Sequence, residues 1–438
     1  MSARVFHAEL WGKREKKYAQ LASSDVSTTT WSELPTAEPH YWFVPKDLRL
    51  QAEYDQGWSV TRIFGTGNPP SDQGKRWASG VKTNRDHLLI DFDRSILHQR
   101  TGVLAGRKLS DEEVKVRFGL ADGRYWNTAR ERQKIRAANW EANIVPYLYR
   151  PFDLRWILYQ PNLIEIHRGG ASKFVMQHMV QCNLALLTMR QTVPYLPYSF
   201  AGVTRRLVDH GVFYLGNKGE GKAFPLYVCD HERRRANLAP EFVRQLGERV
   251  GLEFVEDGRG DFEDTFGPED VFDYIYAVLH SPTYRNRYEE FLKIDFPRIP
   301  LTSDRELFRS LVALGGQLVA LHLLEADIFK DPANFITSFP EPGSNVVERV
   351  RYDEVHERVY INKTQYFQGL PKEVWEFHVG GYQVLHKWLK DRGPKRGQPG
   401  RALTDDDITH YHKVVLALKQ TIRAMAGIDA AIPSWPIQ

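Results

Sequence analysis

The sequence predicts an α+β protein in which strands concentrate in the first part of the chain and helices in the second. Short β-branched and aromatic runs bounded by glycine or proline recur up to about residue 236, which is typical of strands. After residue 237, apolar residues recur at helical spacing over long stretches. The chain has 438 residues, and a single hydrophobic core usually stops growing below that size. We therefore expect a mixed α/β lobe at 1–236 and a mainly helical lobe with a small β insert at 237–438.

The beginning of the chain alternates strand and helix signals. The pattern predicts a strand at 4–12, a helix at 13–24, extended stretches at 28–34 and 40–47, and a helix at 48–58. A glycine-rich, basic loop follows at 65–80, and the aliphatic run at 87–93 predicts a strand.

The next stretch contains a helix start and a hairpin. Ser110 and Glu113 have the spacing of a capping box, so a helix begins there. Pro151 and Asp153 suit a turn, which makes the flanking runs a β-hairpin. The remaining elements expected up to residue 229 are a basic helix at 127–142, hairpin strands at 143–150 and 154–160, a helix at 169–180, a strand at 183–191, and strands with loops at 192–229.

The second lobe is predicted to be helical and mainly architectural. Pro268 suits the first position of a helix whose apolar face includes Ile275. Thr404 and Asp407 can cap the start of the last helix. Further helices are expected at 281–293 and 305–327, a β insert at 348–362, and a buried stripe in the last helix at Ile408, Tyr411, Val415, Leu418 and Ile422.

Composition indicates a cytoplasmic protein. The only two cysteines, Cys182 and Cys229, are too few for a disulfide framework, which favours a reducing compartment. We expect no membrane span, because no apolar run approaches about 20 residues, and the N-terminus lacks a signal-peptide pattern. The net charge of +4 permits nucleic-acid binding without proving it.

One short motif points towards DNA methylation. Residues 68–71 read Asn-Pro-Pro-Ser, whereas amino-methyltransferases that act on DNA have an aromatic residue in the fourth position to stack on the flipped base. Ser71 cannot stack, and the preceding glycines lack the spacing that holds adenosylmethionine. A proline–glycine loop is the more economical interpretation.

Other catalytic patterns are weaker still. Glu113 and Lys115 imitate half of a nuclease site but fall in a capped helix. His410 and His412 point to different helix faces, and His378 with His386 has no cysteine nearby, so ordinary histidines account for both pairs. A Walker loop is absent. We expect no complete catalytic centre and no metal site in this chain.

Loops of the first lobe repeatedly combine arginine and lysine with amide side chains. Arginine suits guanine, asparagine and glutamine suit adenine, and lysine suits phosphate, so these loops favour nucleic acid over a merely solvated surface. The candidate DNA-binding residues are Lys75, Arg76, Lys82, Asn84, Arg85, Arg190, Gln191, Arg205, Arg206, Lys218 and Lys222.

Several long strings together resemble one family, the type ISP restriction–modification enzymes. In the first half these are FHAELWGKREKKYAQLA, YWFVPKD, GVKTNRDHLLIDFD, YLYRPFDLRWILYQPNLIE and NLALLTMRQ. In the second half they are VFDYIYAVLHSPTYRNRYEEFLKIDFPRIPL, GGQLVALHLLEAD, VYINKTQYFQGLPKEVWEFHVGGYQVLHKWLKDR and ITHYHKVVLALKQTI. They resemble the C-terminal target-recognition domain, which follows an adenine methyltransferase, an ATP-driven translocase and a nuclease in that family.

The resemblance implies sequence-specific recognition of double-stranded DNA beside a methyltransferase domain or subunit. It implies S-adenosylmethionine, ATP and Mg²⁺ for the full assembly but no cofactor and no catalytic residue in this chain. Two alternatives stay open, a complete adenine-specific methyltransferase that uses residues 68–71 and a non-catalytic scaffold. Within the recognition hypothesis, Arg190, Gln191, Arg205 and Arg206 contact bases, whereas Lys82 and Arg85 hold the backbone.

Overall fold

The computed structural model describes residues 4–34, 41–65, 77–123, 126–160, 163, 171–180, 183–192, 196–214, 219–230, 233–395 and 399–438. Its contacts divide the chain into two compact units, Met1–Glu53 and Tyr54–Gln438. Helices and several small sheets occur together, which confirms the α+β class. The boundary expected near residue 236 stays a prediction.

The first unit contains one strand pair and one helix. Strand β1 (Val5–His7) pairs antiparallel with β2 (Ser32–Leu34), and α1 (Arg14–Ser23) lies between them in the chain. These elements confirm the strand and helix expected at 4–24. The helix expected at 48–58 is largely wrong, because only α2 (Gln51–Tyr54) forms before the chain becomes extended in β3 (Trp58–Ser59). The described part of the stretch 40–47 contains no strand.

Two four-stranded sheets organise the first half of the second unit. One has the order β4 (Ala78–Ser79), β11 (Lys222–Pro225), β8 (Ala185–Thr188) and β9 (Ala201–Thr204), with every neighbour antiparallel. The other has the order β10 (Leu207–Val208), β6 (Ile144–Arg150), β7 (Asp153–Leu158) and β5 (Ile90–Asp91). The β6–β7 pair confirms the predicted hairpin.

The strand expected at 87–93 is mostly wrong. Residues Asp86–Leu89 form a short helix, α4, and only β5 is extended. The amides of Leu88 and Leu89 both bond the carbonyl of Arg85, so the backbone turns before it can join the sheet.

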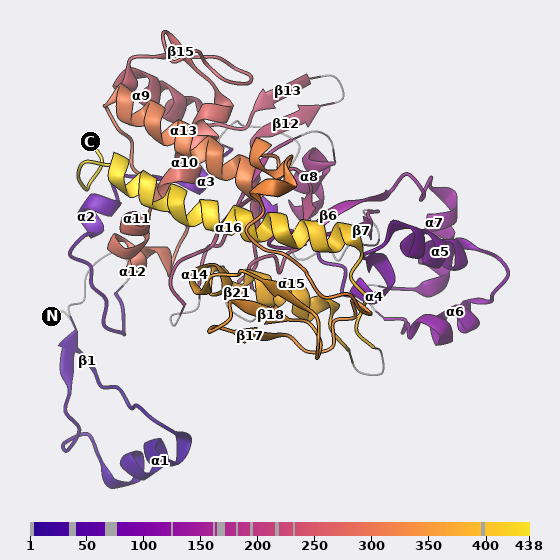
Figure 1. The fold of residues 1–438 in the computed structure, drawn as a ribbon. Helices are drawn as coiled ribbons and strands as arrows, with labels where there is room; N and C mark the ends of the chain where they lie inside the picture. Colours follow the sequence, from indigo (N-terminus) through magenta and orange to yellow (C-terminus); the bar gives the residue numbers. More distant parts are fainter. Residues whose placement is uncertain are drawn as a thin grey trace. The chain divides into compact units, whose positions relative to one another are not determined.

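A group of helices lies beside the second sheet and has its own apolar core (Figure 1). It contains α5 (Arg94–Ala105), α6 (Asp111–Phe118) and α7 (Thr128–Ala137). No sequence pattern predicted α5, which Asp93 caps by accepting from the amides of Ser95 and Ile96. The capping box of Ser110 and Glu113 is confirmed.

The C-terminal half is built on long helices, as predicted. Figure 1 shows α16 (Asp405–Ala431) between α10 (Pro268–His280) and α13 (Arg305–His322) on one side and α15 (Val384–Arg392) on the other. Ile275 is fully buried, and Thr404 with Asp407 forms the predicted capping box. Contrary to expectation, the stretch Arg305–Phe329, which contains α13, is long and apolar enough to cross a membrane. However, 44% of its most apolar window is buried inside the protein, because α13 packs against α10 and α16.

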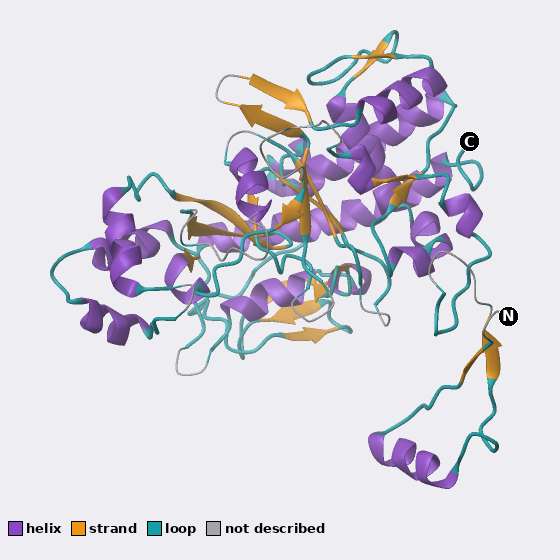
Figure 2. Cartoon of the chain, turned by 180° about the vertical axis from the view of Figure 1, so that it is seen from behind, coloured by secondary structure: helices purple, strands orange, loops and turns teal. Residues whose placement is uncertain are grey.

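The predicted β insert is a three-stranded antiparallel sheet. It consists of β17 (Arg351–Asp353), β18 (Arg358–Tyr360) and β19 (Tyr366–Gln368). Figure 2 shows the strands of the molecule as short pieces among helices. The remaining elements are α3 (Val60–Ile63), α8 (Ala171–Met176), β12 (Tyr227–Asp230), β13 (Arg233–Ala236), α9 (Pro240–Val250), β14 (Glu253–Phe254), β15 (Thr265–Phe266), α11 (Pro282–Arg287), α12 (Glu289–Leu292), β16 (Arg298–Ile299), α14 (Lys372–Trp375), β20 (His378–Val379) and β21 (Tyr382–Gln383), with 3₁₀ turns at Gln177–Met179, Asp327–Phe329 and Pro332–Asn334.

Buried ion pairs join the β6–β7 hairpin to α15. Asp153 accepts from Arg155 at 2.6 Å and from Arg392 at 3.1 Å, and all three side chains are buried. Although burial alone would raise the pKa of Asp153, the two guanidiniums lower it to about 2. The carboxylate therefore stays charged in the interior, where it links the hairpin to α15.

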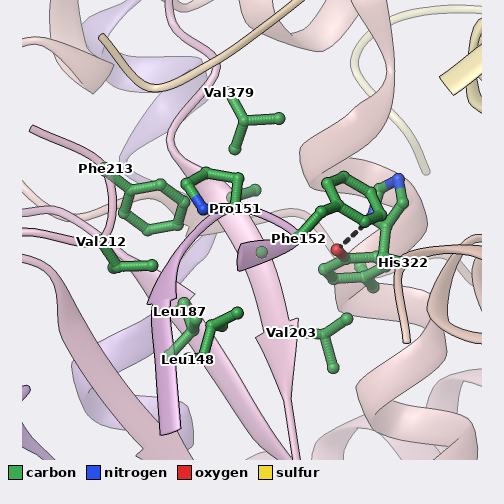
Figure 3. Close-up of a pocket in the computed structure, with 12 residues that line it drawn as sticks. Leu148, Pro151, Phe152, Leu187, Val203, Val212, Phe213, His322 and Val379 are labelled. Carbon is green, nitrogen blue, oxygen red and sulfur yellow. Dashed lines mark hydrogen bonds between the residues drawn. The ribbon is translucent and has the colours of Figure 1, made fainter. Parts of the chain in front are cut away.

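A small cavity lies beside this junction. It has a volume of about 40 Å³, and its labelled lining is apolar except for His322 (Figure 3). His322 bonds the hydroxyl of Tyr276 at 2.6 Å and that of Thr421 at 2.9 Å. Burial lowers the pKa of His322 to about 3, so the ring is neutral and serves packing.

Candidate nucleic-acid interface

Three of the predicted loops leave the same end of the β4–β11–β8–β9 sheet. Lys222 is in register with Ser79 on one side and Thr188 on the other. Because β4 and β8 end at these positions and β11 begins there, residues 80–85, 189–192 and 219–222 emerge together. We call these three segments the loop end. A side-chain carbon added at Gly219 would lie 3.2 Å from the carbonyl oxygen of Gln191, so two of the loops touch.

The segment 82–85 is held in one conformation by local hydrogen bonds. Thr83 donates to Asp86 at 2.5 Å and accepts from the amide of Arg85 at 3.0 Å. The hydroxyl of Tyr149, on β6, donates to the other oxygen of Asp86 at 2.9 Å. This arrangement leaves Asn84 exposed, with a positive φ of 51°, at the tip of the turn. An amide group is therefore presented to solvent on a rigid support.

Arg85 is positioned by an aromatic ring. Its guanidinium lies 4.3 Å from the centre of the Trp126 ring, which belongs to the neighbouring helix group. A guanidinium stacked on its flat face has its N–H groups along the edge, in the plane where a phosphate can accept from them. Lys82 is half-buried in the same segment.

A buried network supports the start of this segment. Asp209 accepts from Arg150 at 2.7 Å and from the hydroxyl of Tyr147 at 2.7 Å. The same hydroxyl lies 3.3 Å from the carbonyl of Val81, and Val81 also pairs with Asp209 through a backbone bridge. Burial, together with Asp209, raises the pKa of Tyr147 well above its ordinary range, so the hydroxyl stays a donor.

The second loop carries Arg190 and Gln191, both exposed. Arg190 pairs with Asp295 at 3.0 Å, with side chains 63% and 66% exposed. An ion pair this exposed contributes about 0–1 kcal/mol, so a stronger anion can displace the carboxylate. The third loop carries Lys222, whose ammonium donates to Ser79 at 2.6 Å and lies 3.5 Å from Glu220.

The structure places Arg205 and Arg206 at the other end of strands β8 and β9 from Arg190. Strands β8 and β9 are antiparallel, and Thr204 pairs with Ala185, where β8 begins. The two arginines therefore leave the opposite end of the sheet, about 20 Å from Arg190 at about 3.4 Å per residue. Arg205 donates to Glu325 at 3.0 Å, whereas Arg206 is exposed and makes no ion pair within the described residues.

The other residues singled out from the sequence have structural roles or lie outside the described residues. Lys75, Arg76, Lys218, Cys182 and the segment 68–71 belong to the latter group. Glu113 bonds Ser110 in its capping box. His410 bonds the carbonyl of Phe152 at 2.7 Å, and His412 bonds the hydroxyl of Thr337 at 2.7 Å. In the described parts of the chain, no group of three or more histidine, cysteine or carboxylate residues could hold a metal ion.

Sequence reasoning missed the supporting residues Asp86, Trp126, Tyr149 and Asp209. These residues occur inside or beside polar and aromatic stretches of the sequence. A charged residue next to a strand needs a partner when it is buried, and this requirement could have pointed to them. What the sequence could not provide was the pairing across strands, which brings Tyr149 to Asp86 over 63 residues.

Comparisons with known proteins give a consistent result. The sequence profile of the type ISP C-terminal specificity domain matches residues 75–426. No curated protein matches the chain.

Three solved structures have a similar fold. One is a nuclease-deletion mutant of the type ISP restriction–modification enzyme LlaGI in complex with a DNA substrate mimic, with a TM-score of 0.65, 18% identity, and coverage of 99% of this chain and 33% of that one. The second is a DrdV–DNA complex, with a TM-score of 0.69, 19% identity, and coverage of 98% and 42%. The third is the ATP-dependent type ISP enzyme LlaBIII bound to DNA, with a TM-score of 0.66, 15% identity, and coverage of 97% and 27%. The chain thus spans less than half the length of each of these proteins.

Proposed function

Because this chain belongs to the family of type ISP C-terminal specificity domains, we propose that it recognises a specific sequence in double-stranded DNA. The observation that carries the proposal is the loop end, where loops bearing Asn84, Arg190, Gln191 and Lys222 leave one edge of a sheet. Amide and guanidinium groups can each make two hydrogen bonds to one base edge in the major groove. Side chains held on a rigid support lose little freedom on binding, which favours discrimination between sequences.

Each loop residue has a role that follows from how it is held. Arg190 and Gln191, both exposed, contact bases, and Asn84 at the tip of its turn is a third candidate. Arg85, stacked on Trp126, and Lys82 hold the phosphate backbone, and Lys222 adds positive charge beside them. Lys75, Arg76 and Lys218 are proposed contacts from the adjoining segments.

Arg205 and Arg206 remain proposed base contacts at a second position on the duplex. The separation of about 20 Å corresponds to about six base pairs at about 3.4 Å per step. A duplex lying along β8 and β9 would therefore meet Arg190 and Arg206 at different base pairs. To contact a base, Arg205 would first have to break its exposed ion pair with Glu325.

The chemistry of restriction and methylation is proposed to lie in other parts of the assembly. The described residues offer no carboxylate or histidine cluster for Mg²⁺, and the sequence has no Walker loop for ATP, so nothing in the described residues assigns these groups to this chain. We assign S-adenosylmethionine, ATP and Mg²⁺ to the partner methyltransferase domain or subunit and the motor. Because such an assembly would act on cellular and invading DNA, we propose that it is cytoplasmic.

The direct test is selection of a randomised duplex library by the purified chain at several salt concentrations. We expect one enriched sequence and an affinity that falls steeply with salt, because phosphate contacts release counterions. Binding without sequence enrichment would leave a general DNA-binding protein, and no binding would support a scaffold. Transfer of methyl groups to DNA, abolished by changing Asn68, would instead establish a complete methyltransferase.

A further inference from the structure

The outer face of the β17–β18–β19 sheet carries a continuous stack of arginine and tyrosine. The register places Arg351 opposite Tyr360, and Tyr360 opposite Tyr366. The guanidinium of Arg351 lies 4.2 Å from the Tyr360 ring centre, and the two tyrosine rings are 5.2 Å apart. Arg358 lies 4.3 Å from the ring of Tyr366 at the other side of the stack. The opposite face buries Val359 and Phe367, so the stack is presented outwards on a fixed support.

A surface hollow of about 400 Å³ opens at one end of this stack. It is lined by Glu348, Arg349, Arg351, Tyr360, Asn362 and Lys363. Asn362 uses both ends of its amide to hold the adjoining turn, so it shapes the hollow without facing a ligand as a free group. Three cations against one carboxylate leave the lining positive.

The cations of the hollow lack strong partners. Arg349 and Lys363 are exposed and form no ion pair with any residue that the structure describes. Arg351 lies 3.9 Å from Asp353, and its side chain is 55% exposed. Acidic residues gather instead at the other end of the sheet, where Glu354 and Glu357 occupy the turn between β17 and β18. The hollow therefore carries a net positive charge that can bind an anion.

Direct contacts connect the hollow to the segment that carries the loop 82–85. Val347, next to Glu348, donates its amide to the carbonyl of Arg401 at 3.1 Å. The guanidinium of Arg401 lies 4.9 Å from the ring of Phe92, which follows α4 and β5 in the chain. The hollow and the loop end thus belong to one connected body of packed residues.

We propose that this hollow binds the phosphodiester backbone of the duplex, outside the base pairs that the loop end recognises. Arg349, Arg351 and Lys363 would each meet a phosphate, and the Tyr360 ring would hold the Arg351 guanidinium edge-on to it. The inference rests on the proposed function, because it assigns a second contact to the same ligand. The sequence predicted that the second lobe is mainly architectural. The proposal departs from that prediction for this small sheet alone.

The test compares the double variant Arg349→Gln/Lys363→Gln with a matched control, Lys330→Gln/Lys372→Gln. The control removes the same charge from lysines of the same lobe that are paired with Asp327 and Glu354. Affinity for the preferred duplex and for an unrelated duplex is measured across a salt series. Each lost phosphate contact lowers the slope of log affinity against log salt by about 0.9, so the double variant should lose about 1.8 and the control nothing. The ranking of sequences should stay unchanged.

A third variant gives an effect of the opposite sign. Glu348→Gln removes the only carboxylate of the hollow and should raise affinity for every duplex. It also keeps the proposal testable if the double variant folds poorly, which melting curves would reveal.

The outcomes separate this inference from the proposed function. If the wild-type chain binds no duplex, both are overturned. If it binds, but the double variant keeps the slope of the control or Glu348→Gln leaves affinity unchanged, only the hollow is overturned. A double variant that changes the ranking of sequences would show base contact and would overturn the backbone assignment.

Discussion

The loop end and the helical core formed by α10, α13 and α16 differ in how they hold their polar groups. In the core, His322 bonds the buried hydroxyl-bearing side chains of Tyr276 and Thr421. At the loop end, Arg190 shares an exposed carboxylate, and Asn84 faces solvent. Burial makes the first set costly to disturb, whereas solvent makes the second set easy to redirect to a ligand.

Under the proposed function, stability and recognition belong to different parts of one compact unit. Changes in the core or at its junction should lower the melting temperature and affect DNA binding only through folding. Changes at the loop end should alter binding at constant melting temperature. The following variants test that division, from the largest expected effect to the smallest.

Asp153→Asn should have the largest effect, because it removes the buried carboxylate that Arg155 and Arg392 share and leaves them only the longer pairs with Asp391 and Asp407. Breaking a buried ion pair costs about 3–5 kcal/mol, measured here as the free energy of unfolding at neutral pH. Asp327→Asn, which breaks an exposed pair with Lys330, is the matched control and should cost almost nothing. Equal stabilities would mean that the junction is solvated.

The pH dependence of the same variant has a definite sign. The pKa of Asp153 is lowered to about 2, below its unfolded value of about 4, so its stabilising effect is full above pH 4. That contribution is lost as the pH falls through about 2. The difference in stability between the wild type and Asp153→Asn should therefore shrink over this interval in acid denaturation curves.

Ile275→Ala should destabilise the core by about 2–5 kcal/mol, because the side chain is fully buried in α10. Ile96→Ala is a suitable comparison, since Ile96 is 49% exposed on α5. Thermal melts of both variants give the measurement. An unchanged melting temperature for Ile275→Ala would contradict its place in the core.

Arg190→Ala should leave stability unchanged and cost about 1–3 kcal/mol of discrimination at one base pair. Lys82→Ala should instead weaken all sequences alike and lower the salt slope by about one unit. A randomised duplex library and a salt titration distinguish the two results. Full sequence preference in the Arg190 variant, or altered preference in the Lys82 variant, would reverse their assigned roles.

Tyr149→Phe should have the smallest effect, about 1 kcal/mol of stability, because it removes one hydrogen bond to Asp86. Tyr352→Phe removes a comparable bond to the carbonyl of Leu370, far along the chain from the loops. Both should lower stability similarly, but only Tyr149→Phe should weaken DNA binding, because Asp86 supports the turn at Asn84. Equal affinities would show that the turn is rigid without this bond.

Local patterns predicted the elements whose signals lie within a few residues. The capping boxes at Ser110 and Thr404, the β6–β7 hairpin and the buried face of α10 all formed as expected. The aliphatic run at 87–93 wrongly predicted a strand. The hydrogen bonds of Thr83, Asp86 and Tyr149 outweigh the strand propensity of this run and turn the backbone into α4.

The sequence by itself determined the fold class, the family and the supply of arginine, lysine and amide side chains in loops, because these depend on composition, periodicity and short strings. Only the tertiary structure decided which of those side chains share a surface. Antiparallel pairing of β8 and β9 sends Arg190 and Arg205 to opposite ends of one sheet, although they are fifteen residues apart in the chain. Register between strands is set by packing and turns over the whole domain, so no local pattern contains it.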